Sequence, residues 1–222
     1  MTHETSDVLI VGSGIIGLSL AQELALQRLS VTVLERGQIG QEASSASAGI
    51  LAPRADMEEA GPLAQLLLAS RKIYPEFVKQ VSGRSGVGID FSISGLLSVA
   101  LNLEQQAELD RKKQQQTDLG LDVQSLSREE TLRLESGLNP ELLSALYFPE
   151  EGYVDNRELV EAVRVACLQL GVRLVPECEA LAVKAEQSKV SGVETNSGFF
   201  ASERVVIAAG SWSGQIPTGL PY

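Results

Sequence analysis

The chain has 222 residues, which is enough for one large domain or two small ones with a substantial core. Hydrophobic residues make up 44% and charged residues 21%, the composition of an ordinary soluble globular protein. The formal net charge of −11 argues against nucleic acid and against an anionic membrane surface as partners, so any bound phosphate must be held by local backbone donors.

The apolar runs are too short to span a bilayer, and the N-terminus shows no secretory signal. Cys167 and Cys178 lack metal or redox spacing, so we expect buried free thiols in a reducing, cytoplasmic compartment. The only histidine, His3, falls in a polar N-terminal tail. Catalysis that requires histidine is therefore not expected, and no metal site is predicted.

The first 35 residues predict a strand, a helix and a second strand in succession. An apolar run at 8–11 indicates a short buried strand, and apolar residues fall at helical spacing from Ile15 onward. A second apolar run at 31–34 indicates another buried strand, which Glu35 ends.

Three glycines in G-x-G-x-x-G spacing, Gly12, Gly14 and Gly17, join the first strand to the helix. In dinucleotide-binding units the first allows a tight turn, the second lets a pyrophosphate approach the backbone, and the third lets the helix pack closely. The N–H groups and dipole at the helix start favour phosphate. Glu35 follows Gly14 by about 20 residues, where the acid that binds a ribose hydroxyl is expected. We therefore predict a dinucleotide site; the alternative is an ordinary βαβ unit with a glycine-rich turn.

The next stretch, 37–53, is rich in glycine, alanine and serine. Small side chains let the backbone lie close to a ligand, and the hydroxyl groups of Ser44, Ser45 and Ser47 can donate to phosphate. Because the stretch directly follows the ribose-binding acid, we interpret it as a binding loop rather than a flexible linker.

Three segments, VGSGIIGLSLAQEL, LERG and GQEASSASAGILAP, resemble the N-terminal region of the D-amino-acid-oxidase-like FAD-dependent oxidoreductases, and within them the glycine oxidase branch. The resemblance, rather than the glycine spacing, favours FAD over NAD, because an NAD-binding unit is not expected to carry this alanine- and serine-rich loop. It implies an α/β fold with a Rossmann-like parallel FAD-binding sheet, discontinuous in sequence, and an inserted, incomplete antiparallel β-sheet for the substrate.

The middle of the chain predicts alternating helices and strands. Apolar spacing indicates a helix over 61–81, which Pro75 should kink or interrupt, and then a loop over 82–88. The other elements expected here are two strands within 89–101, a solvated helix over 104–119, a short helix capped by Ser127 and Glu130, and a strand over 145–148.

The last third returns to α/β character. Asp155 and Glu158 indicate the start of a helix that Gly171 ends, followed by a buried strand over 172–175. Then come an antiparallel meander over 178–202 and a buried strand over 205–208. The stretches GYVDNRELV and A-A-G-x-W resemble family segments that lie in the FAD domain and beside the cofactor.

The resemblance also implies a division of the chain and a set of cofactor contacts. Residues 1–85 would form the first part of the FAD-binding domain, 86–150 part of a substrate domain, and 151–222 the second part of the FAD-binding domain. The implied FAD-binding residues are Gly12, Gly14, Ile15, Ile16, Gly17, Glu35, Arg36, Ala43, Ser44, Ser45, Ala48, Gly49, Ile50, Ala180, Ala209 and Gly210. We expect Trp212, two residues further on, to pack in the core.

The activity that the resemblance implies is the oxidation of a small amino acid or amine. A hydride would pass from the α-carbon to flavin N5, the imine would hydrolyse, and dioxygen would take the electrons. Glycine, with a role in thiamine biosynthesis, follows from the branch; sarcosine, D-amino acids and an NAD-linked reductase remain alternatives.

The competing interpretation is a non-catalytic FAD-binding fragment. The family's carboxylate-binding arginine, the rest of its substrate sheet and its last FAD-binding strand and helix lie beyond the position of Tyr222. Of the arginines present, only Arg54 is expected near the flavin ring. No catalytic residue is assigned, and a homo-oligomer is left open.

Overall fold

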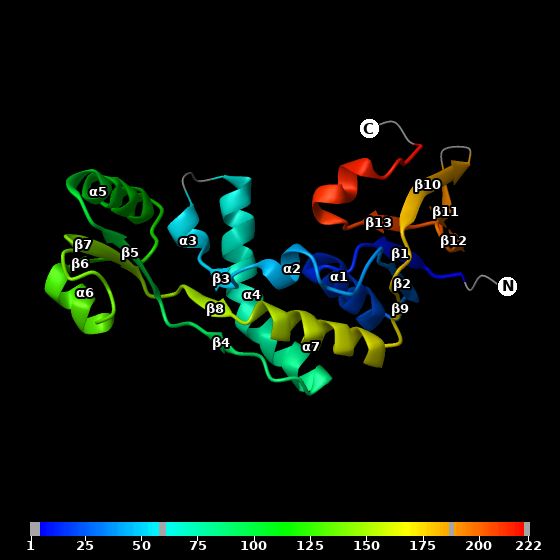
Figure 1. Ribbon diagram of the computed structural model, residues 1–222, viewed down its shortest axis with the longest axis horizontal. Coiled ribbons are helices and arrows are strands. Elements are labelled where there is room, and N and C mark those ends of the chain that lie inside the picture. The colour runs from blue at the N-terminus through cyan, green and yellow to red at the C-terminus, as the bar shows by residue number, and fades with distance from the viewer. Residues whose placement is uncertain (1–4, 58–60, 187–188, 220–222) are drawn as a thin grey trace. The chain divides into compact units, whose positions relative to one another are not determined.

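The computed structural model describes residues 5–57, 61–186 and 189–219, so His3 lies outside the described part (Figure 1). The chain divides into two compact units. The first contains Met1–Ala48, Lys79–Ile89 and Asp155–Tyr222, and the second contains Gly49–Val78 and Asp90–Val154.

This division groups 49–78 with 90–154, whereas residues 49–78 were expected in the first part of the FAD-binding domain, 1–85, and residues 86–150 in a substrate domain. The physical reason is strand pairing, since β3 (Ile50–Leu51) pairs with β8 (Gly152–Val154). The functional roles of the three segments stay a prediction.

A parallel sheet forms the centre of the first unit. Its strand order is β13-β1-β2-β9, and every neighbouring pair is parallel. The strands are β1 (Val8–Val11), β2 (Val31–Leu34), β9 (Arg173–Val175) and β13 (Val205–Ile207), with α1 (Ile15–Leu26) joining β1 to β2. The predicted strand, helix and strand are confirmed, and the carboxyl ends of all four strands lie along the same edge of the sheet.

One buried cluster packs this sheet against an antiparallel meander. Leu9, Val11 and Leu34 belong to a buried apolar cluster with Val183 and Val193 of an antiparallel meander. The meander, predicted from the sequence, consists of β10 (Ala180–Glu186), β11 (Lys189–Thr195) and β12 (Gly198–Ala201).

Two helices of the first unit lie side by side, α1 and α7 (Asn156–Gln169) (Figure 1). The Sγ of Cys167 on α7 donates to the backbone oxygen of Leu18 on α1 at 3.3 Å. Both cysteines are buried and free, as predicted. The strand expected at 205–208 is present as β13, but the expectation that it is buried was wrong. Its residues are half-buried, because β13 is an edge strand of the sheet.

The second unit is built on antiparallel strands, which agrees with the predicted α/β fold. One sheet has the order β5-β7-β6 and the other β3-β8-β4. The other strands of this unit are β4 (Phe91–Ser92), β5 (Leu96–Ala100), β6 (Gln124–Ser127) and β7 (Ser144–Phe148). Its helices include α3 (Pro53–Asp56), α5 (Leu103–Asp118) and α6 (Arg128–Leu134). Ala52, Ala55, Leu146 and Phe148 form its buried cluster. The predicted capping box of Ser127 and Glu130 is present at α6.

The helix α4 (Pro62–Ser85) differs from its prediction. It runs through Pro75 without ending, although a proline inside a helix removes a backbone donor and crowds the preceding turn. It also extends to Ser85, where the loop expected from Ser82 should already have begun. Gly86, at φ +74°, ends it and donates its N–H to the Ser82 oxygen. No helix in the described ranges, α4 included, is long and apolar enough to cross a membrane.

Candidate cofactor site

The glycine-rich turn after β1 depends on the absence of two side chains. Gly12 has φ +105°, and a Cβ there would overlap the backbone of Ala208. A Cβ on Gly17 would overlap the carbonyl oxygen of Gly12. The first glycine therefore makes the tight turn and the third lets α1 pack against it, as the motif predicts.

A pocket of about 650 Å³ lies in the first unit, where β1, β2 and β13 end. Its wall combines the glycine-rich turn, the end of β2, the start of the meander and the segment after β13. Of the residues predicted to contact the cofactor, those that line it are Gly12, Gly14, Ile15, Ile16, Glu35, Arg36, Ala43, Ser44, Ala180, Ala209 and Gly210.

The remaining predicted contacts do not line this pocket. Gly17 is buried behind the turn, and the Ser45 hydroxyl donates to the Gly40 oxygen instead. The short helix α2 (Ala43–Ala46) presents only its beginning to the pocket. Ala48 comes after this helix and is exposed. Gly49 and Ile50 belong to the second unit, so their role stays a prediction.

The start of α1 lines this pocket. Gly14 is the N-cap of α1, and the Ile15 N–H donates to Ser44 Oγ at 2.9 Å. A Cβ on Gly14 would meet, among the described atoms, only Ser44 Oγ, at 3.1 Å. An anionic group therefore has room to reach the helix start at Gly14 and the Ser44 hydroxyl.

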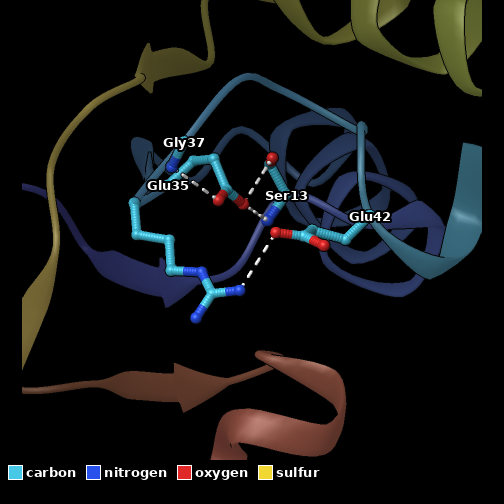
Figure 2. A network of polar contacts seen from close by, with 5 residues as sticks. Ser13, Glu35, Gly37 and Glu42 are labelled. Atoms are coloured by element: carbon cyan, nitrogen blue, oxygen red, sulfur yellow. Dashed lines mark hydrogen bonds and ion pairs between the residues drawn. The ribbon is translucent and has the colours of Figure 1, made fainter.

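Glu35 is held in a hydrogen-bond network at the pocket wall (Figure 2). Its Oε2 accepts from the N–H of Ser13 at 2.9 Å and from the Ser13 hydroxyl at 2.7 Å. Its Oε1 accepts from the N–H of Gly37 at 3.0 Å, and the residue is only 8% exposed. The sequence analysis missed Ser13, which stands between the first two glycines of the motif and is fully buried.

Arg36 and Trp212 face each other across the same pocket. The Arg36 guanidinium carbon lies 3.9 Å from the centre of the Trp212 ring, within the range of a cation–π contact. Arg36 Nη2 also donates to Glu42 Oε1 at 3.0 Å (Figure 2). The expectation that Trp212 packs in the core was wrong: it is half-buried and lines the pocket, because it lies in a 3₁₀ helix (Gly210–Gln215) at the pocket wall. The A-A-G-x-W stretch was the signal that pointed to it.

Arg54, the arginine expected near the ring, lies in the second unit and pairs with Glu150. Its backbone N–H donates to Glu151 Oε1 at 3.0 Å. Its Nε and Nη1 have no hydrogen-bond partner among the described residues, and both atoms are buried. These atoms are therefore not accessible to a ligand in this conformation.

Comparison with known proteins identifies the family. The family model described as FAD dependent oxidoreductase, DAO, matches residues 7–221. The chain belongs to this family. FAD is the cofactor of the DAO family, so the choice of FAD over NAD is confirmed.

Two curated relatives match nearly all of this chain. The bifunctional protein ThiO/ThiG of Synechocystis sp. is 37% identical over 96% of this chain and 31% of its own length. The glycine oxidase of Geobacillus kaustophilus is 35% identical over 97% of this chain and 57% of its own length. The present chain thus spans between 31% and 57% of the length of these curated relatives.

Solved structures of the family share this fold. The crystal structure of the Geobacillus kaustophilus glycine oxidase superposes with a TM-score of 0.92 at 34% identity, covering 97% of this chain and 58% of that chain. The reduced L-α-glycerophosphate oxidase of Mycoplasma pneumoniae, solved with FAD bound, has a TM-score of 0.82 at 28% identity, covering 94% and 55%. The predicted DAO-type fold is confirmed.

Proposed function

We propose that the pocket at the end of β1, β2 and β13 holds FAD, and that the whole protein oxidises a small amino acid. The observation that carries the proposal is the meeting of three features in one pocket: the N-terminus of α1, the Glu35 carboxylate and the Ala209–Gly210 backbone. The N-terminus of α1 would bind the pyrophosphate, and the Glu35 carboxylate would accept from the ribose. The Ala209–Gly210 backbone would lie against the rest of the cofactor.

Individual residues then take specific roles. The helix start at Gly14 and Ile15, with the Ser44 hydroxyl, binds the pyrophosphate, and Glu35 accepts from a ribose hydroxyl. Ala180, which lines the pocket, would contact the adenine through its backbone. Bound FAD would supply the two-electron acceptor that the oxidation needs, since in flavoproteins the cofactor carries the redox step.

The substrate proposal rests on the names of the relatives. Glycine oxidases and ThiO/ThiG proteins favour glycine as the amine, dioxygen as the oxidant and a role in thiamine biosynthesis in the cytoplasm. Sarcosine and D-amino acids remain the alternative substrates. Because the chain spans about half of these relatives or less, this activity is proposed for the whole protein.

The test is the absorbance of the purified protein, followed by titration of the apoprotein with FAD. We expect absorption of blue light by bound flavin and quenching of flavin fluorescence on binding. Gly14→Val should purify with less flavin at unchanged helix content, because a branched side chain would occupy the space in front of the α1 N-terminus.

Gly83→Val is the matched control, since no described atom lies within 4 Å of a Cβ at that position. Normal flavin occupancy in Gly14→Val would contradict the site assignment. A protein that neither contains nor binds flavin would contradict the proposed function itself.

A further inference from the structure

The Ser13 hydroxyl connects three segments around the pocket. It donates to Glu35 Oε2 at 2.7 Å and accepts from the N–H of Gly40 at 3.1 Å. The glycine-rich turn is thereby joined both to the acid after β2 and to the loop that leads into α2. All three bonds of Ser13, including that of its own N–H, are buried.

These bonds restrict how Glu35 can meet a ligand. A carboxylate oxygen accepts about two hydrogen bonds, and both donors to Oε2 come from Ser13. Oε1 accepts one described bond, from Gly37, so it is the oxygen with acceptor capacity left. The carboxylate is therefore fixed in orientation before any ligand arrives, which removes the entropic cost of ordering it on binding.

We propose that Ser13 is a positioning residue that acts through Glu35, orienting its carboxylate for the ribose of an adenine dinucleotide. The inference rests on the proposed binding of FAD in this pocket. Without the Ser13 hydroxyl, Oε2 loses one of its two donors and the loop at Gly40 loses its connection to the turn. Glu35 then takes several orientations, of which only some present Oε1 to the ribose.

A serine at the other end of the same sheet, where β1 and β2 begin, provides a control. The N–H and the hydroxyl of Ser30 donate to one oxygen of Asp7 at 2.8 Å and 2.7 Å. The Ser30 hydroxyl in turn accepts from a backbone N–H, that of Asp7, at 2.9 Å. Ser30 therefore makes the same three kinds of bond as Ser13, in an exposed position away from the pocket. Ser30→Ala removes a serine hydroxyl that is bonded in the same way but does not contact Glu35.

The experiment is a double-mutant cycle on FAD affinity, read from the quenching of flavin fluorescence. We expect Ser13→Ala to weaken FAD binding about tenfold, the size typical of a lost hydrogen bond to a carboxylate. In the Glu35→Ala background the same change should weaken binding less than about twofold. Ser30→Ala should leave FAD affinity unchanged. An equal loss from Ser13→Ala with and without Glu35 would overturn the proposal.

A second measurement uses the ligand-free protein and is independent of flavin. Ser13→Ala should speed hydrogen exchange of the Gly40 amide, whose acceptor it removes, while Ser30→Ala should not. Unchanged exchange at Gly40 would overturn the proposal even if FAD binds normally. Absence of FAD binding in the unmodified protein, with faster Gly40 exchange in Ser13→Ala, would count against the proposed function and leave the Ser13 connection supported.

Discussion

Burial determines the protonation of Cys167, which lies between α7 and α1. The loss of water around the Sγ raises the pKa of this thiol to about 12, and the Sγ donates its proton to the Leu18 oxygen. The thiolate is the reactive form of cysteine, so this side chain should be inert in the folded protein.

We predict that Cys167 reacts with a thiol reagent only after unfolding, measured in a Cys178→Ala variant so that a single thiol remains.

The raised pKa of Cys167 also has a consequence for stability. An unfolded thiol ionises near pH 8.5, so the free energy of unfolding should fall as the pH rises from about 8.5 towards 12. Cys167→Ala should lack this decrease; rapid labelling of the native protein would contradict the prediction.

Glu151, in the second unit, is fully buried and has one oxygen, Oε2, without a partner in the described part. Burial raises the pKa of this carboxyl, although the Arg54 N–H and the charges of Arg54 and Arg71 oppose the increase. The folded state therefore binds the proton more tightly than the unfolded state does. The stability gained in this way is present at low pH and is lost as the pH rises through the raised pKa.

We predict that Glu151→Gln gains stability relative to the unmodified chain as the pH rises from 5 to 8, because glutamine never carries the buried charge. Denaturant unfolding at the two pH values gives the comparison. Glu141→Gln is the control, since that residue is exposed and lies in the same unit. A Glu151→Gln variant that loses stability relative to the unmodified chain on going to pH 8 would show that the carboxylate is favoured where it lies.

At the scale of elements, α7 depends on its N-cap residue, Asp155. The Asp155 side chain accepts from the N–H groups of Arg157 and Glu158, both at 2.9 Å. Because α7 packs against α1, which begins at the cofactor pocket, fraying of α7 would also loosen the support of that helix.

We predict that Asp155→Ala lowers the free energy of unfolding by about 1 kcal/mol, the usual cost of losing an N-cap. Asp155→Asn should retain most of the stability, because asparagine also caps helices. Thermal or denaturant unfolding of the three proteins tests this. Equal losses in both variants would indicate that the charge, rather than the cap, is what matters.

The elements that could be predicted are those whose signal is local. The strands β1 and β2 follow from short apolar runs, the turn from glycines that no other residue could replace, and α6 from the Ser127–Glu130 capping box. Each of these patterns is complete within a few residues, so tertiary structure had little left to decide.

Features that depend on partners far along the chain could not be predicted. Gln116 lies on a helix that looked fully solvated, yet it is buried because its amide donates to the backbone oxygen of Arg54. Ser13 is an unremarked position of the glycine motif until Glu35 and Gly40 are placed beside it. At the site, the residues of the glycine motif were predictable, whereas the hydrogen bonds that join them to other segments were not.

At the scale of the whole molecule, neither Arg36 nor Arg54 is free to bind a substrate carboxylate within the described part of the chain. A carboxylate bound in an apolar site needs a cationic partner, usually an arginine. Arg36 contacts Trp212 and Glu42, and Arg54 pairs with Glu150 with its remaining nitrogens buried. Leu63, Leu66 and Ile73 of α4 are also 65–68% exposed, which favours association of the isolated chain.

We therefore predict that residues 1–222 alone bind FAD but give little or no glycine-dependent peroxide, and that they tend to aggregate. A chain that continues to the length of the relatives should gain both solubility and activity. Peroxide formation and light scattering of the two proteins are the measurements. Robust glycine oxidation by residues 1–222 that Arg54→Ala abolishes would instead make Arg54 the carboxylate ligand.

The strand order also determines when the cofactor pocket can form during synthesis. The ribosome makes β1, α1 and β2 first, but β13, the neighbour of β1 on its other side, is made almost at the end of the described chain. The nascent protein therefore carries the glycine-rich turn long before the Ala208–Gly210 wall that faces it. Flavin capture must therefore wait until residues 205–216 have left the exit tunnel, because the glycine-rich turn alone is only one side of the pocket.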